Sequence, residues 1–146
     1  MILSADTNLF LYAANADSKY YDAAQEFFAD QASGQSRFLV CELVLVEIYM
    51  QVRNPAVFRK PKPARQAAAF CEALRANSFW EFADYEPEVS KRLWQWASTT
   101  TTGFRQIIDA RLAITLRLHG VTHFATTNRK DFSGFGFEKV WNPITV

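Results

Sequence analysis

Short apolar runs alternate with helical patterns along the whole chain. Runs of strand length cover 2–5, 38–41, 79–82 and 123–126, and 139–141 is a shorter fifth candidate. The run 38–41 is apolar throughout, which is typical of a strand buried on both faces of a parallel sheet. Strands that alternate with helices are joined by right-handed crossovers. The pattern therefore predicts an α/β fold with a central, mainly parallel sheet of four to five strands, flanked by helices on both faces.

The segments between these runs repeat their apolar residues at the spacing of one helical face. Helices are predicted at 9–15, 20–31, 42–52, 64–76, 87–97 and 107–118. Between the third and fourth of them, 54–63 contains three prolines and is predicted to be a loop. Because no internal repeat or change of composition divides the chain, we expect residues 1–146 to form a single domain.

The composition supports a folded domain and limits the electrostatic arguments. The 146 residues are 49% hydrophobic and 15% aromatic, enough for a proper core. The formal net charge is +1, so any site for a polyanion must come from local charge. Cys41 and Cys71 lie in apolar surroundings and are predicted to be reduced thiols rather than a disulfide or zinc set. The first residues have no basic segment and no long apolar core, which predicts a cytoplasmic protein without a signal peptide or membrane helix.

Four carboxylates stand out by their context, because they follow predicted strands or lie in predicted apolar helices. Asp6 follows the first strand, Glu47 lies close to the apolar stripe of its helix, and Asp109 opens a strongly apolar helix. Asp131 follows the fourth strand, and its alternative interpretation is an ordinary turn residue. Strand ends and helix starts project to the same edge of a parallel sheet, so these side chains can converge. Clustered carboxylates repel one another unless a cation compensates, and hard divalent ions such as Mg²⁺ and Mn²⁺ prefer oxygen ligands.

Each carboxylate also has an ordinary structural interpretation. Asp6 can cap the helix that follows it, and Asp109 can interact with the dipole of its own helix. Glu47 could form an ion pair with Arg53 or Lys62. For any one of these residues, the structural role is the more usual one. For all of them together it is less so, because unrelated structural roles would have to place several carboxylates at the same sheet edge by coincidence.

Basic residues adjoin the predicted acidic edge. They are candidates for contacts with the phosphates of a nucleic acid substrate, and solvated surface charge is the alternative. These residues are Arg105, Arg111, Arg129 and Lys130.

The ordered set of motifs resembles the PIN-domain ribonucleases, and within them the VapC toxins of bacterial toxin–antitoxin modules. The matching segments are 4–8 after the first strand, 46–49 in an early helix, 108–113 at the start of a late helix, and 125–132 after the fourth strand. No single segment is specific, but their order runs from one end of the chain to the other.

The resemblance implies a PIN fold and an endoribonuclease that depends on Mg²⁺ or Mn²⁺. In such an enzyme a metal-activated water attacks the RNA phosphodiester. The family's acidic residues map onto Asp6, Glu47 and Asp109. Asp6 and Asp109 are expected to bind the metal directly, and Glu47 and Asp131 to act through water. The resemblance also implies a homodimer and inhibition by a VapB-like antitoxin.

The segment after the fourth strand departs from the family pattern. Asn128 stands where many members carry Asp, and Asp131 follows three residues later. Either the carbonyl oxygen of Asn128 or Asp131, through water, can complete the metal shell. Thr7 and Thr127 match polar positions that line the family's site. The alternatives to a toxin are a PIN-type nuclease outside a toxin–antitoxin module and an RNA-binding module that does not cut.

Overall fold

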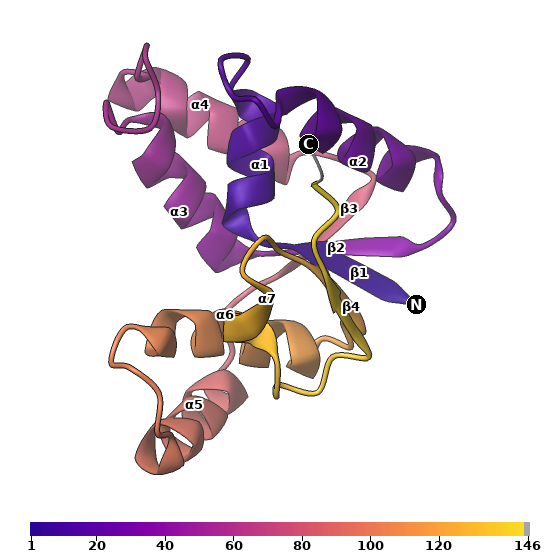
Figure 1. Ribbon diagram of the computed structural model, residues 1–146, viewed down its shortest axis with the longest axis vertical. Helices are drawn as coiled ribbons and strands as arrows, with labels where there is room; N and C mark the ends of the chain where they lie inside the picture. The colour runs from indigo at the N-terminus through magenta and orange to yellow at the C-terminus, as the bar shows by residue number, and fades with distance from the viewer. Residues whose placement is uncertain (145–146) are drawn as a thin grey trace.

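The computed structural model describes residues 1–144, in which five parallel strands form one sheet in the order β3-β2-β1-β4-β5 (Figure 1). The strands are β1 (Ile2–Ala5), β2 (Arg37–Cys41), β3 (Trp80–Ala83), β4 (His123–Ala125) and β5 (Lys139–Trp141). Every neighbouring pair is parallel. The predicted α/β class is confirmed, and the described sheet is parallel throughout rather than mainly so.

Helices cover both faces of the sheet (Figure 1). They are α1 (Thr7–Ala14), α2 (Tyr21–Ser33), α3 (Glu42–Val52), α4 (Ala64–Arg75), α5 (Pro87–Thr99), α6 (Gln106–Leu118) and α7 (Arg129–Phe132). In Figure 1, α1 to α4 lie on one side of the sheet, and α5 and α6 lie on the other. The chain moves outward from β1 to β3 and then returns to the other side of β1 to form β4 and β5. The connections therefore diverge between β1 and β4, which makes this the topological switch point where α/β proteins bind ligands.

The structure differs from the prediction at a few boundaries. The third strand begins one residue later than predicted, and α7 occupies a segment that was expected to be loop. α7 is only one turn long, so hydrophobic periodicity cannot reveal it. Segment 54–63 forms no helix or strand, as predicted, but Phe58 within it is buried and anchors it to the core.

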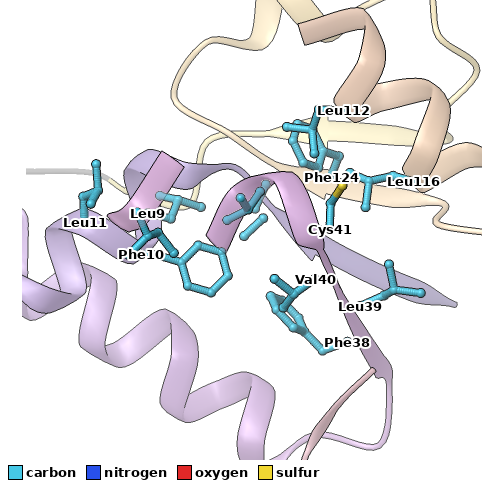
Figure 2. Packing of buried hydrophobic residues seen from close by; sticks show 14 of the residues in the cluster. Leu9, Phe10, Leu11, Phe38, Leu39, Val40, Cys41, Leu112, Leu116 and Phe124 are labelled. Carbon is cyan, nitrogen blue, oxygen red and sulfur yellow. The ribbon is translucent and has the colours of Figure 1, made fainter. Parts of the chain in front are cut away.

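The core fills both faces of β2 (Figure 2). Phe38 and Val40 point to the side of α1, whereas Cys41 points to the side of α6, as the period-two geometry of a strand requires. Burial raises the pKa of the Cys41 thiol to about 11, so it stays protonated at neutral pH. Both cysteines are free thiols, as predicted, although Cys71 is only partly buried. Within residues 1–144, no helix is both long enough and apolar enough to span a membrane.

Candidate functional site

Asp6 is held at the switch point by both strands that meet there. Its backbone N–H donates to the carbonyl of Ala125 in β4 (2.9 Å). Its side chain caps α1 by accepting the N–H of Thr7 at 2.8 Å, and its other oxygen accepts the hydroxyl of Thr126 at 2.9 Å. Burial raises the pKa of Asp6, the hydrogen bonds from Thr126 and Thr7 lower it, and repulsion by Asp131 raises it further. Asp6 is therefore a helix cap, and its carboxylate forms no salt bridge within residues 1–144.

Glu47, in α3, contacts Thr7, the residue next to Asp6. The hydroxyl of Thr7 donates to its carboxylate at 3.3 Å. Burial is the main cause of a raised pKa for Glu47, and the charges of Asp6 and Asp109 raise it further, against the hydrogen bond from Thr7. Three carboxylates from distant parts of the chain thus interact electrostatically at one place.

The alternative ion pairs of Glu47 do not form in the part of the chain that the structure describes. Arg53 instead donates to the hydroxyl of Tyr49 at 2.9 Å. The ammonium of Lys62 lies 5.3 Å from the ring centre of Phe70. No cation therefore neutralises Glu47 from either predicted position.

Asp109 occupies the first turn of α6 and is partly buried. Burial raises its pKa to about 6, with further contributions from the charges of Asp6 and Asp131. It lines an open cleft of about 540 Å³ together with Asp131 and four residues that precede or begin α6: Gly103, Phe104, Arg105 and Gln106. The cleft gives solvent access to Asp109 and Asp131.

The loop after β4 brings an exposed carboxylate to the same place. Asp131 lies in α7, and its backbone carbonyl accepts the side-chain amide of Gln106 at 3.0 Å, which ties α7 to α6. Asn128 precedes α7, and its backbone N–H donates to Thr126 at 3.0 Å. Its side chain is exposed and bonds to no carboxylate among residues 1–144. The charge of Asp131 acts on both Asp6 and Asp109, whereas Asn128 is uncharged and offers only its amide oxygen.

Thr126 is the site residue that sequence reasoning missed. It is fully buried, it donates to Asp6, and it accepts the backbone N–H of Asn128. Thr127, which was predicted instead, is partly buried and has no side-chain hydrogen bond within the described residues. Asp6 and Thr126 come directly after Ala5 and Ala125, which are paired across β1 and β4. This register of β1 against β4 places Thr126 beside Asp6, and it cannot be read from a single sequence.

The donor set fits a hard divalent cation in its chemistry, because every candidate is an oxygen ligand. Within residues 1–144, no three His, Cys, Asp or Glu side chains are close enough to surround one ion directly. Mg²⁺ does not require such a cage, since it commonly keeps several waters and is held by one or two carboxylates together with substrate phosphates. Asp6 and Asp109, supported by Glu47 and Asp131, could hold an ion in this way.

The predicted basic residues divide into two groups. Arg105 lines the cleft, and Arg129 and Lys130 are exposed on α7. Arg111 instead lies over the ring of Tyr85, with 5.0 Å between its guanidinium carbon and the ring centre. Arg105 therefore adjoins Asp109 and Asp131 in the cleft, and Arg129 and Lys130 adjoin Asp131 in the sequence, whereas Arg111 lines a separate, small pocket.

Comparison with known proteins agrees with this geometry. The PIN domain family model matches residues 5–138. The chain is a PIN-domain protein. This PIN-domain protein is 45% identical to ribonuclease VapC24 of Mycobacterium tuberculosis over 144 residues, which cover 99% of the chain and 98% of VapC24. It is thus a homologue of the VapC ribonucleases, and the resemblance noted in the sequence is confirmed.

Solved structures share the fold of the PIN-domain protein at low sequence identity. VapC20 of Mycobacterium tuberculosis, described as a toxin that cleaves the sarcin–ricin loop, has a TM-score of 0.71 at 19% identity and covers 92% of this chain and 95% of its own. VapBC2 of Rickettsia felis, bound to a DNA fragment from its promoter, has a TM-score of 0.64 at 18% identity, with 97% and 98% covered. These likenesses confirm the predicted PIN fold.

Proposed function

We propose that the protein is an endoribonuclease that depends on Mg²⁺ or Mn²⁺ and acts as the toxin of a VapBC-type toxin–antitoxin system. The observation that carries this proposal is the group of carboxylates at the switch point. Asp6, Glu47 and Asp109 all have raised pKa values, and a neighbouring carboxylate contributes to each shift. The 45% identity to a VapC ribonuclease supports the same activity.

The carboxylates have distinct roles in this proposal. Asp6 and Asp109 would hold the metal directly, and Glu47 and Asp131 would hold its waters. When bound, a divalent ion polarises a phosphoryl oxygen and lowers the pKa of a coordinated water, which supports hydrolysis of a phosphodiester. The hydroxyl of Thr126 keeps Asp6 oriented and favours its ionised form.

The residues around the carboxylates would receive the RNA. Arg105, Arg129 and Lys130 can neutralise backbone phosphates beside the cleft, and Arg111 is a more remote candidate for the same contact. Thr127 and Asn128 adjoin the site without a side-chain bond to a carboxylate, so we assign them supporting roles. A cytoplasmic location, a homodimeric state and a VapB-like antitoxin complete the proposal. Support for the antitoxin comes from related structures, since VapBC2 of Rickettsia felis is a complex of this type.

The proposal is tested by cleavage of total RNA by the purified protein, with sequencing of the cut ends. We expect cleavage in Mg²⁺, none in chelator, and loss of cleavage in Asp109→Asn. Glu81→Gln is the matched control, because Glu81 is a carboxylate on β3 that pairs with Arg37. Cleavage that persists equally in Asp109→Asn would contradict the assignment. RNA binding without cleavage by the wild-type protein would support an RNA-binding module instead.

A further inference from the structure

Phe104 is exposed to an extent that no core role explains. It lies in the turn before α6, and 86% of its surface is accessible to solvent. No other large hydrophobic side chain among the described residues is as exposed. The segment that joins α5 to α6 stands out from the body of the protein (Figure 1). An aromatic ring left in water gives up the stabilisation that burial would provide. A single exposed ring is not a binding site by itself, so the residues around Phe104 decide what it can do.

The surroundings of Phe104 combine an aromatic ring, a cation and an acidic site. Phe104 lines the same cleft of about 540 Å³ as Asp109 and Asp131. The guanidinium carbon of Arg105 lies 5.6 Å from the centre of its ring. Arg105 forms no salt bridge within residues 1–144, so its charge is available to a phosphate. The cleft that contains the carboxylates therefore also offers a ring for a base and a cation for its phosphate.

We propose that Phe104 stacks on an unpaired base of RNA bound in the cleft and that Arg105 contacts the adjoining phosphate. The proposal rests on the proposed ribonuclease function, and it adds a residue that selects an unpaired nucleotide beside the carboxylates. Exposed aromatic rings with neighbouring Arg residues are the usual platform for single-stranded RNA, because every base offers a π-face to stack on. A paired base cannot reach the ring without leaving its helix, so Phe104 favours loops and unpaired ends.

Four variants separate stacking from plain apolar contact. Phe104→Ala removes the ring, Phe104→Leu keeps an apolar side chain without a π-face, and Phe104→Trp restores an aromatic face. Phe79→Ala is the matched control, since Phe79 is 71% exposed but does not line the cleft. Phe79 immediately precedes β3, at the amino end of that strand, whereas the candidate site lies at the carboxyl ends of the strands. Because both phenylalanines are exposed, we expect all four variants to retain the thermal stability of the wild-type protein.

The experiment is fluorescence anisotropy with a short, labelled single-stranded RNA and a duplex of the same sequence, with Ca²⁺ in place of Mg²⁺. We expect Phe104→Ala to weaken binding of the single strand by roughly 5- to 100-fold. Phe104→Leu should bind as weakly, whereas Phe104→Trp and Phe79→Ala should match the wild-type protein. The duplex should bind more weakly and should not respond to Phe104. A fluorescent base analogue placed along the single strand should show quenching that depends on Phe104.

Three results would overturn the proposal. They are equal binding by Phe104→Ala and the wild-type protein, full binding by Phe104→Leu, and no binding of the single strand at all. Full binding by Phe104→Leu would point to an apolar contact, as with a protein partner. Failure of stacking is distinguishable from failure of the ribonuclease proposal, because cleavage in Mg²⁺ is scored separately. If RNA binding depends on Phe104 but the protein does not cleave RNA, the stacking role of Phe104 stands and the ribonuclease proposal fails. If the protein cleaves RNA but binding does not depend on Phe104, only the ribonuclease proposal stands.

Discussion

Glu81 and Asp109 are carboxylates of the same fold in opposite electrostatic situations. Glu81 on β3 accepts two hydrogen bonds from the guanidinium of Arg37, each of 2.7 Å, and this pairing lowers its pKa. Asp109 has no cationic partner in the described structure, and burial and two neighbouring carboxylates raise its pKa to about 6. The charge of Glu81 is neutralised by Arg37, whereas Asp109 lies among charges of its own sign.

The difference shows that uncompensated carboxylates gather at the switch point, where their ionised forms oppose folding. At the switch point, the hydrogen-bond donors to Asp6 and Glu47 are a backbone N–H and the hydroxyls of Thr126 and Thr7, and none of them carries a charge. Such donors orient a carboxylate without removing its charge, which leaves it free for a cation. Strongly perturbed pKa values that cluster in a cleft are typical of functional sites.

The largest effect is expected from Asp6→Asn. Asn caps a helix about as well as Asp, so α1 should stay intact while the ligand charge is lost. We expect RNA cleavage in Mg²⁺ to fall by about 100- to 1,000-fold, the range seen when one stabilising group is removed from an active site. The melting temperature measured on the same sample serves as the control. Retained cleavage would leave Asp6 as a helix cap alone.

Removal of the hydroxyl that orients Asp6 should have the next largest effect. Thr126→Val keeps the shape of the side chain but deletes its hydrogen bond to Asp6, which raises the pKa of Asp6 further. We expect the affinity for Mg²⁺, read from the metal dependence of cleavage, to fall by about 10- to 100-fold. Thr127→Val is the comparison variant and should lose much less affinity, because the hydroxyl that bonds to Asp6 is that of Thr126. A larger loss of Mg²⁺ affinity in Thr127→Val than in Thr126→Val would favour Thr127, the threonine predicted from the sequence, as the site residue.

Asp109→Asn should stabilise the metal-free protein at neutral pH. The folded state holds the pKa of Asp109 at about 6, above its ordinary value of 3.8, so the ionised form opposes folding. The gain should be complete above about pH 6, should shrink as pH falls, and should vanish below about pH 4. The measurement is thermal unfolding in chelator, where about 3 °C corresponds to 1 kcal/mol in a chain of this size. A gain that did not depend on pH would show that charge is not its cause.

The smallest effect is expected from the paired region. Glu81→Gln breaks an exposed ion pair, and such pairs contribute little to stability. We expect a slight loss of thermal stability and unchanged RNA cleavage. A large loss of cleavage in Glu81→Gln would remove the contrast between the two regions.

Much of this architecture could be predicted from the sequence, because hydrophobic runs report burial directly. The run 38–41 predicted a strand buried on both faces, and Phe38, Val40 and Cys41 are buried there. Asp6 and Asp109 stood out because they interrupt or open apolar segments, and the fold brings their charges together. The PIN family was recognisable from the order of such segments.

The rest depends on register and on tertiary packing. Thr126 and Thr127 are adjacent and chemically identical, and only the pairing of Ala5 with Ala125 decides which of them meets Asp6. The exposure of Phe104 was equally hidden, since an apolar residue in a loop can fold inward, as Phe58 does. Single-sequence patterns carry no information on these alternatives.

The most direct test of a metal site at this edge is calorimetric titration of Mn²⁺ into the wild-type protein, Asp109→Asn and Glu81→Gln. We predict saturable binding to the wild-type protein and to Glu81→Gln, and loss of that binding in Asp109→Asn. Equal binding of Mn²⁺ by all three proteins would contradict the assignment of the switch-point carboxylates as metal ligands.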